Sequence, residues 1–211
     1  MSTPATAPAA DVIDLLAGIA PGSPLARTRD QRPQARENAQ RSFEALLEPA
    51  EAGEFTHAER YAVALFAARL HGFDRAAAFY ADLLADQADD TLLDGVEDAA
   101  SAAAATGPVG TYREPGLAAE SAPTTAWVPD AALAAALGTR LSAALAHTHL
   151  LVFRPREASP AALRALVEAG WSADHVVSLS QLVAFLSFQL RTAWGLSVLQ
   201  SHPATATEAT R

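Results

Sequence analysis

The chain contains no cysteine, and this absence excludes several classes of protein chemistry at once. Disulfides, thiolate metal sites and catalytic thiols all require cysteine, so thiol redox catalysis is excluded. Charged residues are also scarce, at 18% of the 211 residues. Acidic residues outnumber lysine and arginine by 24 to 15, which gives a net charge of −9, and no basic cluster occurs. We therefore expect no binding to nucleic acid, whose phosphate backbone attracts basic patches.

Long uncharged apolar runs are missing as well. We find no stretch that approaches the roughly 18 uncharged apolar residues that a membrane span requires. The N-terminal segment MSTPATAPAADVIDLLAGIAPGS has no basic region before an apolar core, unlike a signal peptide. We therefore expect a cytoplasmic protein that does not associate with membranes. Residues 1–10 and 201–211 are expected to be flexible tails.

What the chain has in abundance is alanine, the strongest helix former, within a hydrophobic content of 50%. No stretch alternates between apolar and polar residues as a half-buried strand does. We therefore predict one all-α domain over residues 11–200, which includes a long irregular loop at 107–129 of undecided role. The helices expected from apolar spacing and end signals cover residues 11–19, 33–49, 59–84, 92–105, 130–153, 160–170 and 173–199.

The helix predicted at 59–84, ERYAVALFAARLHGFDRAAAFYADLL, is apolar on nearly every side at first. Thr56 and Glu59 have the spacing of a capping box at its start. We therefore place this helix in the centre of the bundle. Gly72, near its middle, allows either a break or close packing.

A faint internal repeat precedes two of these helices. EAGEFTHAER (51–60) and EAGWSADHV (168–176) share Glu-Ala-Gly, then an aromatic residue and a hydroxyl N-cap. These matches fit an internal duplication and two ordinary helix starts equally well.

Two segments resemble one known family. FTHAERYAVALFAARLHGF (55–73) resembles the core helix of the alkylhydroperoxidase D-like, carboxymuconolactone decarboxylase superfamily. ASPAALRALVEAGWSADHVVSLSQLVAFLSFQLRTAWGL (158–196) resembles the second helical pair of the same superfamily. The likeness covers about residues 40–85 and 140–199 and is closest to a peroxidase-related branch without cysteines. It implies an alkylhydroperoxidase D-like helical bundle.

The peroxidase members of that family use a relay written Glu-x11-Cys-x-Tyr-Cys-x3-His. The corresponding positions here are Tyr61, Phe73, Arg75, Ala76 and Tyr80, and none keeps the family's residue. A phenol with a pKa of about 10 does not replace a carboxylate base near neutral pH. The resemblance therefore implies the fold without the peroxidase activity.

Four residues are candidates for a pocket where the family's redox site lies: Tyr61, His71, Tyr80 and Arg191. The tyrosines are more simply explained as core aromatics with satisfied hydroxyls. For Arg191 we favour a structural role, because a guanidinium on an apolar helix must leave the core or be paired. The acidic partner expected for it is Glu59 or Asp174.

His147 and His149 are two residues apart on a predicted helix, so they lie on different faces. We therefore expect no metal site, and no cofactor is indicated elsewhere.

The leading functional hypothesis is a cysteine-free member of this family that acts as a non-redox structural or binding partner of an active paralogue. One alternative is a lactone-decarboxylase-type enzyme that uses His71, Tyr80 or Arg191 for proton transfer and carboxylate binding. Another is a module that binds small carboxylates. The resemblance and the alanine-rich helices both predict a homo-oligomer, with a paralogous protein of the family as a further partner.

Overall fold

The computed structural model describes residues 11–122 and 125–202. All regular secondary structure in these residues is helical, which confirms the all-α prediction. The α-helices are α1 (Val12–Ala17), α2 (Pro24–Asp30), α3 (Pro33–Leu47), α4 (His57–Leu70), α5 (Asp74–Ala85), α6 (Asp90–Ala102), α7 (Ala131–Phe153), α8 (Pro160–Glu168) and α9 (Ala173–Ser201). Two 3-10 helices complete the order, η1 (Pro115–Glu120) and η2 (Pro155–Glu157).

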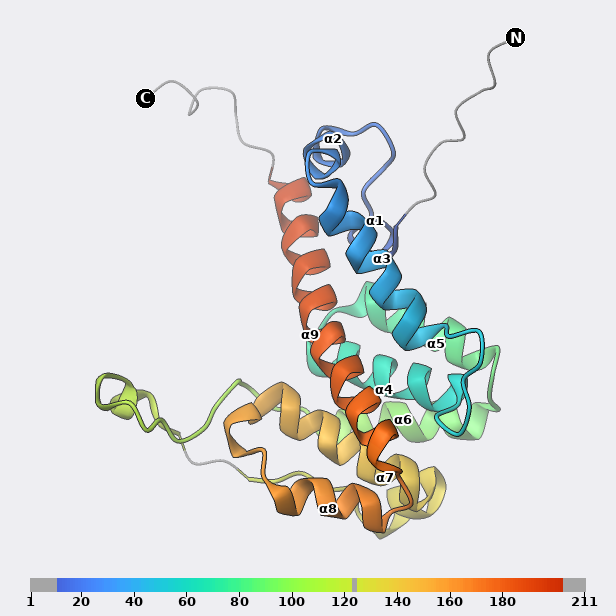
Figure 1. Ribbon diagram of the computed structural model, residues 1–211, viewed down its shortest axis with the longest axis vertical. Helices are drawn as coiled ribbons and strands as arrows, with labels where there is room; N and C mark the ends of the chain where they lie inside the picture. The colour runs from blue at the N-terminus through green and yellow to red at the C-terminus, as the bar shows by residue number, and fades with distance from the viewer. Residues whose placement is uncertain (1–10, 123–124, 203–211) are drawn as a thin grey trace.

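Helix α9 runs along the molecule and joins its two ends (Figure 1). Helices α1 and α3 pack against its C-terminal half, and α4, α7 and α8 pack along its N-terminal half (Figure 1). The buried stripe of α9 consists of Val176, Leu179, Val183 and Leu186, with Leu182, Phe185 and Gln189 beside it. The predicted N-cap, Ser172, accepts from the backbone N–H of His175. Ser201 is still helical, and residues 1–10 and 203–211 lie outside the described part.

Helix α4 occupies the centre of the bundle, as its apolar sequence predicts. Every residue from Arg60 to Ala68 is buried, and α5, α6, α7 and α9 all pack against it. The predicted capping box is present: the hydroxyl of Thr56 accepts from the backbone N–H of Glu59, and the Glu59 carboxylate accepts from the backbone N–H of Thr56. The small alanine side chains of α4 allow its neighbours to approach closely on all sides.

The prediction of one helix over 59–84 is wrong. Helix α4 ends at Leu70, and α5 begins at Asp74 and packs back against α4. Gly72 has φ +65, a left-handed conformation that glycine adopts without strain. Here glycine ends the helix, so it is a break and not a close-packing site.

Helix α2 lies between the helices predicted at 11–19 and 33–49, in a stretch where no helix was expected. Ser23 caps α2 by accepting from the backbone N–H of Ala26, and Pro24 is the first helical residue. Proline is favourable there because its missing N–H needs no partner in the first turn. Two other predicted helices are displaced by a few residues: α3 ends at Leu47, and α6 covers 90–102.

The two Glu-Ala-Gly segments noted in the sequence lie against each other. The rings of Phe55 and Trp171 make an edge contact with centroids 4.9 Å apart. Arg140 of α7 lies 4.1 Å above the Trp171 ring and binds the Glu59 carboxylate at 2.7 Å. Its guanidinium also donates to the backbone oxygens of Gly170 and Glu54. One arginine therefore links the start of α4 to the start of α9.

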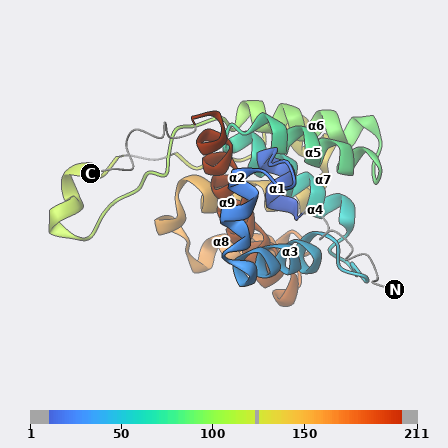
Figure 2. The same ribbon diagram turned by 90° about the horizontal axis from the view of Figure 1, so that it is seen from above.

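Within the loop predicted at 107–129, residues 107–122 extend away from the helices, and η1 lies near the tip of this segment (Figures 1 and 2). At its base, the backbone N–H of Val109 donates to the oxygen of Phe153 at 2.8 Å. Further out, Arg156 forms an ion pair with Glu114 and lies 4.4 Å from the Tyr112 ring. Residues 126–129 return to the bundle, where the Trp127 ring packs 5.3 Å from that of Phe66.

Helix α9 is long and apolar enough to cross a membrane, with a mean hydropathy of 1.4 in its most apolar window. Buried core helices of soluble proteins pass the same test, and part of α9 is buried in this bundle. The expected cytoplasmic location and lack of membrane association therefore stay predictions.

Candidate functional site

The four pocket residues expected from the sequence do not converge on one site. Tyr80 of α5 is completely buried, and its hydroxyl donates to the side-chain oxygen of Gln189. Burial raises the pKa of Tyr80 far above that of a free phenol, although the Gln189 hydrogen bond opposes this shift. Tyr61 is 7% exposed, and its ring stacks on that of His57. Both tyrosines are packed core residues whose protons are held tightly.

His71 and Arg191, by contrast, line one cleft of about 380 Å³, which we call the His71 cleft. It lies between the end of α4, residues 105–108, the C-terminal end of α7 and Arg191 on α9. The Nε2 atom of His71 is buried without a hydrogen-bond partner. Burial, with a further contribution from the positive charge of Arg191, lowers the pKa of His71 to about 4. The cleft therefore combines a neutral imidazole with a fixed positive charge at neutral pH.

The pairing expected for Arg191 is not observed. Glu59 binds Arg140 instead, because Arg140 projects from α7 directly over the start of α4. Arg191 is solvent-exposed and makes no ion pair within the described part of the chain, with Asp174 or any other residue. Its guanidinium has left the core, so its charge is available at the cleft.

A second cavity of about 450 Å³ lies beside α7, and we call it the α7 cavity. Residues 126–129 and α8 form its other walls. Ser142, His147 and Arg154 line it, and each is at least nine-tenths buried. Neither Ser142 nor Arg154 was expected at a functional site from the sequence. The available signal was a set of polar residues within the otherwise Ala/Leu-rich segment 131–154.

His147 and His149 lie on different faces of α7, as their spacing predicts. The Nε2 atom of His147 is 3.0 Å from the hydroxyl of Ser180 on α9. The ring of His149 lies against Trp127 and Phe153, at centroid distances of 5.6 and 5.0 Å. Burial lowers the pKa of both histidines, and the charge of Arg154 contributes at His149. Among the described residues, no group of three or more histidine and acidic side chains is arranged to hold a metal ion.

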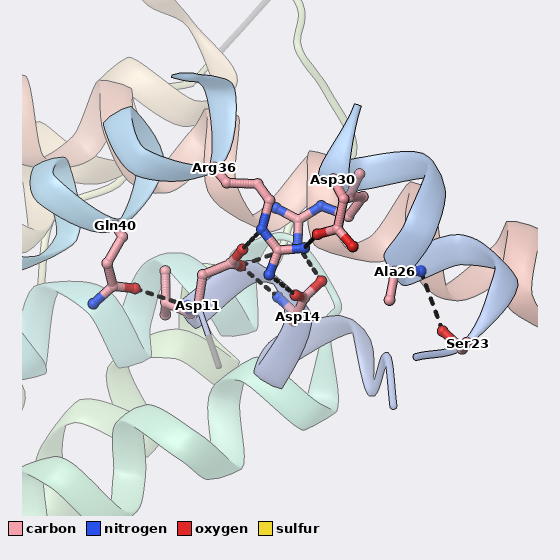
Figure 3. Close-up of polar contacts among 9 residues, drawn as sticks. Asp11, Asp14, Ser23, Ala26, Asp30, Arg36 and Gln40 are labelled. Carbon is pink, nitrogen blue, oxygen red and sulfur yellow. Dashed lines mark hydrogen bonds and ion pairs between the residues drawn. The ribbon is translucent and has the colours of Figure 1, made fainter. Parts of the chain in front are cut away.

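A charged cluster around the buried carboxylates of Asp11 and Asp14 joins α1, α2 and α3, and Figure 3 shows most of it. Arg36 contacts Asp11 at 3.0 Å, Asp14 at 2.6 Å and Asp30 at 2.9 Å. Arg29 also pairs with Asp11 and Asp14. Each of these charges has an opposite partner, so this ion cluster is a structural junction between the three helices.

The comparisons with known proteins returned no family model, no curated protein and no solved structure similar to this chain.

Proposed function

We propose that this protein is a non-redox binding protein for small carboxylates and that the His71 cleft is its binding site. The observation that supports this most directly is that Arg191, without an ion pair in the described part, faces the same cleft as the unpartnered Nε2 of His71. A guanidinium binds a carboxylate through two parallel hydrogen bonds. The neutral imidazole adds an uncharged hydrogen bond, so one ligand satisfies both groups.

The membership in the alkylhydroperoxidase D-like family and its helical bundle also remain part of the proposal. They rest on the two sequence segments that resemble the family. Within that family, the chain corresponds to the branch without redox thiols, because Phe73 and Ala76 stand where the relay has cysteines.

The enzymatic alternative, a lactone-decarboxylase-type reaction, places its chemistry in the same cleft. His71 and Arg191 remain available there for proton transfer and carboxylate binding. Tyr80 is not, because it is fully buried and its hydroxyl is bound to Gln189. Turnover of a lactone acid that is lost in His71→Gln, with carboxylate binding retained, favours the enzyme over the binding module.

A thermal-shift screen tests carboxylate binding. Purified protein is heated with small mono- and dicarboxylates, with the corresponding lactones and with matched neutral amides. We expect carboxylates to raise the melting temperature of the wild type and to have no effect on Arg191→Gln, because a ligand stabilises only the protein that binds it. Arg164→Gln, at an exposed arginine of α8, is the matched control and should respond like the wild type. Equal stabilisation of the Arg191 variant, or no stabilisation of the wild type, contradicts the proposal.

The non-redox part of the proposal has a separate test. With no cysteine, the metal-free protein should reduce peroxide no faster than buffer, even with a dithiol donor. Turnover clearly above buffer contradicts this part and leaves the carboxylate test unaffected.

A role as a structural partner is supported by a different observation, an exposed apolar face on α9. Val177, Phe188 and Leu199 are each more than half exposed, and their spacing of about three helical turns places them on one face of this helix. Large apolar residues gathered on one element are typical of protein–protein contacts. We propose that this face joins copies of the chain in a homo-oligomer, or alternatively joins the chain to a paralogous protein.

Light scattering tests this assembly. We expect an oligomer for the wild type at micromolar concentration and a shift toward monomer for Phe188→Asp. Leu163→Asp, at an exposed apolar position on α8, is the control and should keep the oligomer. A wild-type monomer of 22.0 kDa contradicts the homo-oligomer. An oligomer that persists in Phe188→Asp contradicts the assignment to α9.

A further inference from the structure

The α7 cavity is lined by three polar side chains, each of which has one polar atom that the protein leaves without a hydrogen-bond partner. Ser142 is 8% exposed, His147 5% and Arg154 8%. The Oγ of Ser142, the Nδ1 of His147 and the Nε of Arg154 are all buried without a hydrogen-bond partner. Nearly all buried polar atoms in folded proteins are paired, so three unpaired atoms around one cavity indicate that something else binds them.

The hydrogen bonds behind His147 determine which proton its ring carries. The hydroxyl of Ser180 donates to the backbone oxygen of Val176 at 2.8 Å. A serine hydroxyl has one proton, so Ser180 accepts in its 3.0 Å contact with the Nε2 of His147. The proton of the neutral ring is therefore on Nε2, and Nδ1 presents a lone pair. A ligand at this point must donate a hydrogen bond from a hydroxyl or an N–H.

At Arg154, the ligand must instead provide a hydrogen-bond acceptor. Its guanidinium already binds the carboxylate of Glu157 at 2.6 Å, so its charge is balanced within the protein. The Nε–H that remains is a donor, and it needs an acceptor without needing a second negative charge. A carbonyl oxygen of a neutral molecule meets this requirement. A carboxylate would add a second negative charge beside Glu157, and the single charge of Arg154 balances only one.

The remaining walls of the cavity are apolar, so the part of the ligand between its donor and its acceptor should be apolar as well. Trp127, Leu150 and Leu166 line the cavity together with small alanine side chains. Residues 147 and 154 are seven positions apart, which is about 10 Å along a helix. The donor and the acceptor of the ligand are therefore separated along α7 and are not adjacent atoms.

We propose that the α7 cavity is a binding site for a neutral, mostly apolar small molecule that has a hydroxyl or N–H donor near one end and a carbonyl acceptor near the other. His147 accepts from the donor, Arg154 donates to the acceptor, and Ser142 binds either group. The site shares no lining residue with the His71 cleft and selects neutral ligands where the cleft selects anions.

A binding experiment with a defined probe tests this site. The probe is 2-(4-hydroxyphenyl)acetamide, which has a phenol donor, an aromatic body and a carbonyl acceptor. The ring nitrogens of His147 are followed by NMR during titration, because hydrogen bonding at Nδ1 moves its resonance. We expect a saturable shift, with affinity at least about tenfold weaker for 2-phenylacetamide, which lacks the donor, and for the charged 2-(4-hydroxyphenyl)acetate.

Four variants locate the binding. Ala146→Phe fills the cavity without removing a polar group, so it should abolish the titration and leave a folded protein. Arg154→Gln and Ser142→Ala should weaken binding, and Arg164→Gln on α8 is the matched control that should not. Absence of a saturable shift in the wild type, or a shift that survives Ala146→Phe, overturns the proposal. So does a crystal structure grown with the probe in which water alone satisfies the three atoms. Carboxylate stabilisation through Arg191 is independent of each of these outcomes.

Discussion

The ion cluster of α1, α2 and α3 and the cavity beside α7 both place polar side chains in the protein interior, but only the first pairs them. In the cluster, the guanidinium of Arg36 reaches three carboxylates, and Arg29 reaches two of the same three. The backbone N–H of Val12 is satisfied as well, by Gln40 at 2.9 Å. Such a group holds three short helices in one arrangement, because each of its charges has an opposite partner within the protein.

In the α7 cavity, each polar residue has at least one atom that the protein leaves unpaired. A closed interior would make these atoms costly, by about 1–3 kcal/mol each. The comparison shows that burial of polar groups alone does not mark a functional site. The useful difference is whether the protein itself provides the partners.

The largest change in the free energy of unfolding is expected in the ion cluster, where every charge has an opposite partner. Arg36→Ala removes one guanidinium from among three aspartates and leaves their charges poorly compensated, so it should lower the free energy of unfolding by about 3 kcal/mol. Arg41→Ala, on the same helix, breaks only an exposed pair with Glu37 and should change it by less than about 0.5 kcal/mol. Urea denaturation of the two variants measures the difference, and similar values would remove the basis of the comparison.

The stability of the protein should depend on pH through His71, which has a buried nitrogen without a partner like those of the α7 cavity. Its folded-state pKa of about 4 lies below the unfolded value of about 6.5, so the unfolded chain binds a proton first as pH falls. Stability is therefore lost between about pH 6.5 and pH 4, by up to about 2 kcal/mol at pH 5. Urea unfolding at pH 8 and pH 5 should show this loss in the wild type and a smaller one in His71→Gln.

Tyr80 and Gln189 are an intermediate case, paired on one side only. The hydroxyl of Tyr80 binds the oxygen of Gln189, whose Nε2 has no partner. Tyr80→Phe leaves that oxygen unsatisfied in the core and should cost about 1–2 kcal/mol. Tyr112→Phe, on the projecting loop, serves as the control and should be nearly neutral. Thermal unfolding monitored by circular dichroism distinguishes the two variants.

The smallest change in stability is expected for a substitution in the α7 cavity. Ser142→Ala removes a buried hydroxyl that has no partner, so stability should stay within about 0.5 kcal/mol of the wild type or rise slightly. A loss above about 1 kcal/mol, measured by urea denaturation, would mean that Ser142 already has a partner in solution. In that case the difference between the cavity and the ion cluster would disappear.

Local sequence signals predicted much of this fold. The hydroxyl N-caps expected before α4 and α9, Thr56 and Ser172, both accept backbone hydrogen bonds. The apolar sequence at 59–84 also predicted the central position of α4. These features depend on residues close together in the chain, and a single sequence contains that information.

The wrongly predicted helix boundaries lie at residues that can have either of two effects on a helix. Pro24 starts α2 although proline also ends helices, and Gly72 breaks a stretch that is apolar throughout. The candidate site was harder still. Arg191 differs from Arg140 only in what the fold places beside it, and no local pattern indicates that Arg140 reaches Glu59 across 81 residues. Unpartnered atoms such as the Nδ1 of His147 become visible only when every neighbour is in place.

The projecting loop has a consequence for how the chain can be divided. Trypsin cleavage after the exposed Arg113 separates a fragment with α1–α6 from one with α7–α9. Helix α9 packs against α1, α3 and α4, and α7 packs against α4 and α6, so each fragment completes the interior of the other. We expect the nicked protein to remain assembled and the separated fragments to regain structure on mixing. The molecule thus offers a natural division point for a two-fragment complementation reporter.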